Sequence, residues 1–146
     1  MKRLFIDSDL FVRDLRYPRD ARTAINSRFL ERVKKGTLRG ATSIFNVLEV
    51  CGILSHNYSV SQLTGLYADF CSHYRLQVFF PADEDGGLQY DIAKIFTQMQ
   101  KKQSLGDAQI GYVVERFSNQ ISSFVSWNAA HFVGKFSVPV VTPEHF

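Results

Sequence analysis

Residues 40–54 read GATSIFNVLEVCGIL and join a short β-like run, Gly40–Thr42, to a longer segment with helical periodicity. This order recurs along the chain, so that short apolar runs alternate with longer helix-period segments. Strands of this kind, separated by helices, indicate βαβ units and a parallel sheet that helices cover on both faces. The sequence therefore predicts an α/β fold with three layers, α/β/α, around a central parallel sheet of about five strands.

The expected strands and helices follow from the same pattern. Strands are predicted at Leu4–Ile6, Gly40–Thr42, Gln77–Phe80, Ser123–Ser126 and Val138–Val141. Helices are predicted at Asp20–Lys35, Ser43–His56, Ser59–Tyr74, Gly87–Gln103, Asp107–Ser118 and Ala129–Gly134. In open parallel sheets, ligands bind beyond the carboxyl ends of the strands, so the functional residues are expected there.

Length and composition limit the class of protein. With 146 residues, 45% of them hydrophobic and 21% charged, the chain is expected to form one soluble globular domain, residues 1–146. No apolar run approaches the roughly 20 residues of a membrane span, and MKRLFIDSDLF lacks the features of a secretory signal. A cytoplasmic location without membrane contact is therefore expected. The two cysteines, Cys51 and Cys71, belong to no zinc-ligand pattern.

Positive charge is concentrated in the first part of the chain. Residues 1–40 hold 11 of the 17 Lys and Arg residues and 5 of the 14 acidic residues, which is a net charge of +6. A run of this kind is often only a solvated face, but Arg and Lys side chains also supply most non-specific affinity for nucleic acids. The residues that we expect to contact a phosphate backbone are Arg13, Arg16, Arg19 and Arg22.

Glu49 is the single charge within the apolar segment IFNVLEVCGIL. On a helical wheel, Ser43, Asn46 and Glu49 form a narrow polar line on an otherwise apolar surface. Such a helix should be buried, and a buried carboxylate needs a positive partner or a bound cation, unless a raised pKa leaves it neutral. No Lys or Arg lies between Arg39 and Arg75, so the partner must come from elsewhere in the fold.

Other polar residues stand at strand ends and helix starts. Asp7 directly follows the first strand, Asp9 lies two residues later, Asp107 opens a helix, and Asn128 lies just past the fourth strand. Each position also has a structural interpretation. Asp7 could accept hydrogen bonds from loop amides, Asp9 and Asp107 could be helix N-caps, and Asn128 could be a turn residue.

Three of the carboxylates, those of Asp7, Glu49 and Asp107, can converge at one mouth of a parallel sheet. Carboxylates that are brought together repel one another unless a cation neutralises them, and such hard oxygen ligands select Mg²⁺ or Mn²⁺. Two such ions about 4 Å apart would activate a water molecule and stabilise the leaving oxygen of a phosphodiester. The residues therefore point to metal-dependent phosphoryl chemistry.

The chain resembles a PIN domain, most closely the VapC type of toxin–antitoxin systems, in the order and spacing of five segments. These are FIDSDLFV, NVLEV, GDAQIGYVVE, FVSWNAAHF and VPVVTPEHF. The resemblance runs nearly the whole chain, from Leu4 to Phe146. It implies an α/β/α fold with a parallel sheet, and an endoribonuclease that cleaves RNA with bound Mg²⁺ or Mn²⁺.

The resemblance also assigns roles to individual residues. Asp7, Glu49 and Asp107 match the three acids that would ligate the metal, and with Asn128 they form the predicted catalytic set. Ser126 matches the hydroxyl position just before Asn128. Asp9 stands where the first motif often carries Asn. Ser126 and Asp9 are therefore predicted to support the metal ligands.

Asn128 departs from the family, which often has a fourth aspartate at this position. An amide oxygen still coordinates a metal weakly, but the substitution removes one negative charge. One tightly bound ion is therefore expected, with any second ion held more weakly. The usual context of the family also implies a homodimer and a small antitoxin partner, although no segment of the sequence indicates either.

Two other interpretations remain open. The opening FIDSDLF also fits a haloacid-dehalogenase-like phosphatase, with Asp7 as nucleophile and Asp9 as acid and base. That family needs a downstream lysine, and Lys101 and Lys102 are poorly placed for the role. Alternatively, the chain is a PIN-like module that binds RNA or a protein without cleavage, which the loss of a carboxylate at Asn128 favours.

Overall fold

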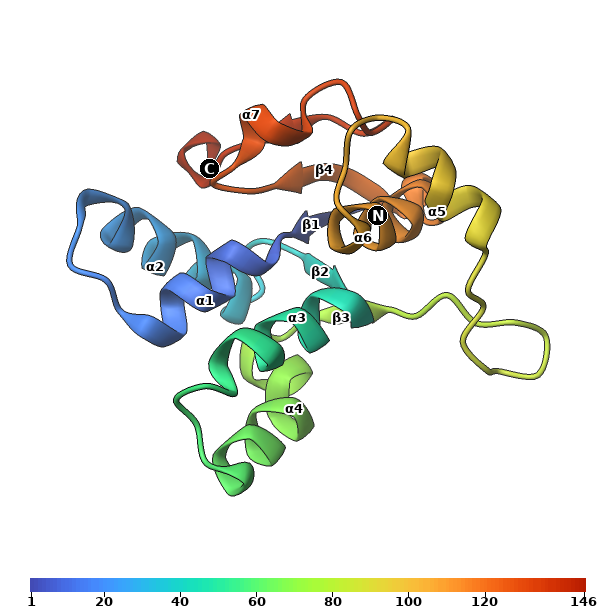
Figure 1. Cartoon of the computed structure of the whole chain (residues 1–146). Helices are drawn as coiled ribbons and strands as arrows, with labels where there is room; N and C mark the ends of the chain where they lie inside the picture. The colour runs from blue at the N-terminus through green and yellow to red at the C-terminus, as the bar shows by residue number, and fades with distance from the viewer.

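The computed structural model describes residues 1–146, which form five strands and seven α-helices (Figure 1). The strands are β1 (Arg3–Ile6), β2 (Gly40–Ser43), β3 (Gln77–Phe79), β4 (Ile121–Val125) and β5 (Val140–Val141). The helices are α1 (Ser8–Arg16), α2 (Ala21–Lys34), α3 (Ile44–Leu54), α4 (Val60–Tyr74), α5 (Ile92–Met99), α6 (Leu105–Arg116) and α7 (Ala129–Phe132). Two 3-10 turns, Ser118–Gln120 and Pro143–His145, complete the chain.

The strands form one sheet in the order β3-β2-β1-β4-β5, and every neighbouring pair is parallel. After β1 the chain builds outward through β2 and β3 on one side. It then crosses back to add β4 and β5 on the other side. The strand order thus reverses between β1 and β4, and in open parallel sheets this switch point opens a crevice beyond the carboxyl ends of the strands.

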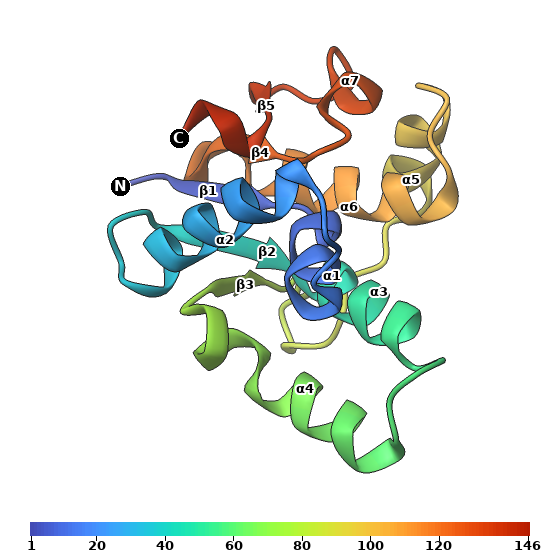
Figure 2. The same cartoon turned by 90° about the vertical axis from the view of Figure 1, so that its left-hand side faces the viewer.

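Helices cover both faces of the sheet, and each face has its own hydrophobic core (Figures 1 and 2). On one face, α1, α2, α3 and α4 bury large side chains that include Phe11, Leu30 and Tyr74. On the other face, α5, α6 and α7 pack around Phe124, whose ring lies 5.3 Å from that of Phe5. The prediction of a three-layer α/β/α fold with a five-stranded parallel sheet is confirmed.

One helix, α1, was not predicted from the sequence. The backbone N–H of Ser8 donates to the side chain of Asp7, which caps the helix, while Leu10 and Phe11 are fully buried beneath it. The capping aspartate and this apolar pair were the available signals.

The prediction for α5 was too long. A helix was expected over Gly87–Gln103, but the helix begins after its N-cap, Asp91, and ends at Met99. The chain before it forms a loop. The guanidinium of Arg116, at the end of α6, donates a hydrogen bond to the carbonyl of Ala82 in this loop at 2.6 Å. None of the helices is long and apolar enough to cross a membrane.

Candidate functional site

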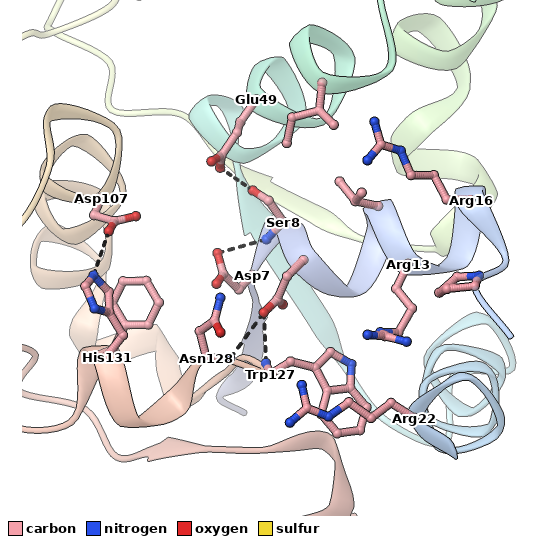
Figure 3. Close-up of a pocket in the computed structure, with 15 residues that line it drawn as sticks. Asp7, Ser8, Arg13, Arg16, Arg22, Glu49, Asp107, Trp127, Asn128 and His131 are labelled. Carbon is pink, nitrogen blue, oxygen red and sulfur yellow. Dashed lines mark hydrogen bonds and ion pairs between the residues drawn. The ribbon is translucent and has the colours of Figure 1, made fainter. Parts of the chain in front are cut away.

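A pocket of about 750 Å³ lies beyond the carboxyl ends of β1 and β4, at the switch point of the sheet (Figure 3). We call it the acidic pocket. All four residues of the predicted catalytic set line it. The polar residues that line it are Asp7, Ser8, Asp9, Arg13, Arg16, Arg22, Glu49, Asp107, Asn128 and His131, together with the indole of Trp127.

Asp7 is buried at the base of the pocket, where β1 ends and α1 begins. One carboxyl oxygen accepts hydrogen bonds from the Ser8 backbone N–H at 2.8 Å and from the Asn46 amide at 3.4 Å. The other accepts from the Ser126 hydroxyl at 2.8 Å. The backbone amide whose hydrogen bond Asp7 accepts belongs to the first residue of α1 and not to a loop. Burial, followed by the nearby charge of Asp9, raises the pKa of Asp7 to about 8.

Asp9 lies beside Asp7 and shares the Ser126 hydroxyl, which is 3.1 Å from its carboxyl oxygen Oδ2. The same oxygen accepts the backbone N–H groups of Trp127 at 3.0 Å and Asn128 at 3.3 Å. The other oxygen, Oδ1, is buried without a hydrogen-bond partner, and burial raises the pKa of Asp9. The alternative that Asp9 caps a helix is wrong, because the cap of α1 is Asp7.

Glu49 lies on α3 with its side chain exposed toward the pocket (Figure 3). The expectation that it is buried in a low-dielectric surrounding is wrong, because its face of the helix borders the crevice instead of the core. Its carboxylate accepts the Ser8 hydroxyl at 2.6 Å, and that hydroxyl in turn accepts the Asn46 amide at 2.8 Å. The polar line of Ser43, Asn46 and Glu49 therefore points at the end of β1.

Asp107 stands in the first turn of α6, where it pairs with His131 of α7 at 3.2 Å (Figure 3). The alternative that Asp107 is the N-cap is wrong, because the side chain of Ser104 caps the helix by accepting the Asp107 backbone N–H. His131 is not among the site residues that the sequence predicts. Its place opposite Asp107 depends on the packing of α7 beside α6, which no local pattern reveals.

Asn128 occupies the N-cap position of α7, but its side chain makes no capping hydrogen bond. Its backbone N–H donates to Asp9 and, at 3.0 Å, to the Ser126 hydroxyl. The amide side chain is exposed and lines the acidic pocket. The turn interpretation thus accounts for the backbone of Asn128, while its side chain is free to contact a ligand.

Arginines of α1 and α2 form the opposite wall of the acidic pocket (Figure 3). Arg13 is held by an ion pair with Asp20 at 2.6 Å, whereas Arg16 and Arg22 form no ion pair. The guanidinium of Arg22 lies 5.1 Å from the ring centre of Trp127. Arg19, the fourth predicted arginine, is exposed between α1 and α2 but does not line the pocket.

The donor set of the acidic pocket suits a hard cation. It consists of carboxyl, amide and hydroxyl oxygens, and the buried Oδ1 of Asp9 lacks a partner. As they stand, however, no three acidic or histidine side chains lie close enough together to hold one metal ion. Glu49 bonds to Ser8 and Asp107 to His131, so both would have to turn toward Asp7 to join it. The chemistry of the residues fits a divalent ion, and ligation requires side-chain rearrangement.

The phosphatase alternative finds no support in the pocket. That reaction needs a lysine beside the two aspartates, and no lysine lines the acidic pocket. Lys101 and Lys102 follow α5, and the Nζ of Lys101 donates to the carbonyl of Lys135, which lies after α7.

The chain shares a PIN-like α/β fold, a five-stranded parallel sheet with helices on both faces, with solved structures. No protein-family model and no curated protein matches the chain. Two solved structures have the same fold. FitAcB from Neisseria gonorrhoeae superposes with a TM-score of 0.63 and 13% identity, covering 98% of this chain and 99% of that chain. FitAB bound to an IR36 DNA fragment superposes with a TM-score of 0.60 and 15% sequence identity. The match covers 98% of this chain and 96% of that chain.

Proposed function

We propose that this protein is a Mg²⁺- or Mn²⁺-dependent endoribonuclease that acts in the cytoplasm as the toxin of a toxin–antitoxin pair. The observation that carries the proposal is the gathering of Asp7, Glu49, Asp107 and Asn128 around one pocket at the switch point of a PIN-like sheet. These residues are far apart in the sequence, and their positions at strand ends and helix starts predict that they meet.

The roles of the residues follow from their surroundings. Asp7, Glu49 and Asp107 would hold the ion, with the Asn128 amide as a weaker, neutral donor. A bound divalent ion activates water and neutralises charge on a phosphodiester. Ser126 and Asn46 orient the Asp7 carboxyl group through their hydrogen bonds.

The two sides of the acidic pocket carry opposite charges and are proposed to have different roles. Acidic groups lie toward β1, α3 and α6, and the arginines lie on α1 and α2 (Figure 3). Arg16 and Arg22 carry unpaired positive charge and would hold the phosphates that flank the scissile bond. Arg13 shares its charge with Asp20, so its contribution to RNA binding would be smaller.

A cleavage assay tests the proposal. Single-stranded RNA is incubated with the purified protein and Mn²⁺, with and without EDTA. Cleavage is expected only with the metal. Asp7→Asn, Glu49→Gln and Asp107→Asn should each lower the rate at least about 100-fold, because each removes a charged ligand worth several kcal/mol.

The matched control is Asp69→Asn, which neutralises an exposed carboxylate on α4 outside the acidic pocket. It should cleave at the parent rate, and circular dichroism should show that all variants fold. If a folded Asp7→Asn variant cut RNA as fast as the parent, the proposed nuclease site would be wrong.

A second candidate function is a PIN-like module that binds RNA or protein without cleavage. It is favoured by the absence of a ready-made three-ligand site and by the neutral side chain at Asn128. Both functions predict RNA binding in EDTA. RNA bound tightly but left intact in Mn²⁺ would favour the binding module.

A small antitoxin and a second copy of the chain are the proposed protein partners. The PIN-like fold supports this proposal, as do exposed apolar side chains on one face of α5. Ile92, Phe96 and Met99 recur there at helical spacing and are 73%, 58% and 39% exposed. Co-expression with the product of a neighbouring short reading frame would test the antitoxin.

A further inference from the structure

A second large cavity lies at the opposite edge of the sheet, where the strands begin. Its volume is about 920 Å³, which is within the usual range of ligand sites. In Figure 2 the starts of β1, β2 and β3 lie together on the left of the molecule, beside the end of α2. We call it the basic cavity; its polar lining residues are Arg3, Thr37, Arg39, Cys71, Ser72, Arg75 and Gln77.

Three arginines line the basic cavity, and no aspartate or glutamate does. Arg3 opens β1, Arg39 immediately precedes β2, and Arg75 is the C-cap of α4, two residues before β3. None of them forms an ion pair with an acidic side chain. Burial, and then the positive charge of Arg39, lower the pKa of Arg3. The cavity therefore concentrates positive charge that the protein itself does not neutralise.

The guanidinium groups of Arg3 and Arg75 are held in place by the backbone. Arg3 donates to the Gly40 carbonyl at 3.4 Å, and Arg75 donates to the Lys35 carbonyl at 3.3 Å. Gly36, which has a φ of +79°, lets Arg75 pack directly on the chain, because a Cβ there would lie 2.7 Å from its Nη1. These contacts orient the two side chains in part, which lowers the amount of ordering that a ligand must impose on them.

The basic surface continues beyond this cavity. An adjoining hollow of about 280 Å³ shares Arg3, Arg39 and Gln77 with it and adds Lys2. Its other polar lining residues, Asn119 and Gln120, are neutral. The start of the sheet thus presents four cationic side chains without a single carboxylate.

We propose that the basic cavity binds phosphate groups of a nucleic acid strand or a nucleotide. Arginine forks bind phosphate oxygens in pairs, and the hydroxyls of Thr37 and Ser72 are suitable additional donors. The cavity also has a fixed relation to the acidic pocket, because β1 begins at Arg3 and Asp7 follows its end. At about 3.3 Å per residue, the two sites are on the order of 13 Å apart. A role in holding the RNA substrate would rest on the proposed function, but phosphate binding does not.

The first test is RNA binding in EDTA, where no metal-dependent cleavage occurs. Fluorescence anisotropy of a labelled single-stranded RNA is measured over a range of salt for the parent and for Arg39→Gln/Arg75→Gln. If the phosphate belongs to RNA, affinity should fall about tenfold, and the salt slope should fall by about 0.7 for each phosphate that the variant no longer binds. The matched control is Arg28→Gln/Lys94→Gln, which removes two exposed charges from outside the basic cavity and should keep the parent slope.

The second test asks about a free nucleotide and uses the exposed thiol of Cys71, which lines the basic cavity, whereas Cys51 is buried. Inorganic phosphate or a 5′-mononucleotide should slow the reaction of Cys71 with an anionic thiol reagent. This protection should disappear in the double variant. The single variant Arg39→Gln is a second test with less risk to folding, because the Arg39 side chain makes no hydrogen bond that the substitution would remove.

The outcomes separate the sources of phosphate. A change in RNA binding assigns the cavity to a nucleic acid backbone, whereas a change in thiol protection alone assigns it to a free nucleotide. If neither measurement changes in folded variants, the proposal is overturned. Cleavage of a dinucleotide, too short to reach the basic cavity, should be unaffected by Arg39→Gln/Arg75→Gln. Failure of the parent protein to cut single-stranded RNA in Mn²⁺ would count against the nuclease and leave phosphate binding intact.

Discussion

At the scale of single residues, Asp7 and Asp9 are the most constrained groups in the acidic pocket. They share one serine hydroxyl, and burial raises the pKa of each. Two neighbouring carboxyl groups cannot both ionise without cost when little solvent screens them. A proton or a cation must compensate the pair, and this requirement makes Asp7 sensitive to pH.

The stability of the metal-free protein should fall as the pH rises from about 5 to about 8. The pKa of Asp7 is about 8 in the folded chain, against an ordinary value of 3.8. Between these values the folded state keeps a proton that the unfolded state has released, so raising the pH favours unfolding by up to about 1.4 kcal/mol per pH unit. Urea unfolding in EDTA at several pH values measures this slope.

Asp7→Asn is the control for the pH effect. Asparagine does not titrate, so the variant should lose the part of the slope that Asp7 contributes, while Asp9, whose pKa is also raised by burial, still titrates. The exposed carboxylate of Asp69 offers a comparison, and Asp69→Asn should retain the slope of the parent. A parent protein whose stability is flat between about pH 5 and pH 8 would contradict the buried, proton-holding state of Asp7.

Asn128→Asp should increase the affinity for Mn²⁺. The substitution adds a negative charge at the rim of the acidic pocket, and it leaves intact the backbone N–H that donates to Asp9. Isothermal titration should show one tight ion for the parent. The variant should bind a second ion, or the same ion about tenfold more tightly.

Asn128→Ala serves as its comparison, because it removes a neutral donor and should weaken binding only slightly. If the parent protein bound two ions with equal, high affinity, the neutral side chain at position 128 would not limit metal occupancy.

At the scale of elements, the packing of α5 on α6 depends on a glycine. Gly111 is buried in α6, and a Cβ there would lie 2.9 Å from both the Gln98 side-chain oxygen and the Phe136 ring. The same side-chain oxygen of Gln98 is buried and has no hydrogen-bond partner. The two helices can approach only because no side chain separates them.

Gly111→Ala should therefore destabilise the protein, by about 1–3 kcal/mol, because the added methyl group overpacks the helix contact. Gly106→Ala in the same helix meets nothing within 4 Å and should be neutral or stabilising by up to about 1 kcal/mol. Thermal unfolding of the two variants measures the difference. Equal stabilities would mean that α5 shifts freely on α6.

At the scale of the whole molecule, the sheet separates two sites of opposite character. The acidic pocket lies beyond the carboxyl ends of the strands, and the basic cavity lies at their amino ends. None of the exposed apolar residues of α5 lines either site. That face is therefore free for a protein partner without blocking either site.

The protein should be a homodimer in solution, with a mass twice the 16.7 kDa of the chain. Light scattering after size-exclusion chromatography measures it. Phe96→Glu places a charge in the exposed face of α5 and should shift the population toward monomer, because charge is disfavoured in an interface core. Val60→Glu, an 84% exposed position at the start of α4, should leave the mass unchanged. A parent monomer at high concentration would exclude the dimer.

The sequence alone was enough to predict the α/β/α fold and to place Asp7, Glu49, Asp107 and Asn128 at one pocket, although it missed Ser8 and His131. Alternating short strands and helices require a parallel sheet with two covered faces. Residues that follow such strands must emerge at the same edge, which brings Asp7 and Asn128 together. The polar line on α3 added Glu49 for the same reason, since a helix after β2 begins at that edge.

Only the tertiary structure decided which of these groups are buried and what they contact. Glu49 is exposed because its face of α3 borders the crevice. Asp9 is half-buried, and its carboxylate accepts hydrogen bonds from the backbone amides after β4. Likewise, Arg3, Arg39 and Arg75 are distant in sequence and meet because three parallel strands start side by side. Local patterns report the spacing of residues along an element, whereas burial and charge compensation depend on the elements that pack against it.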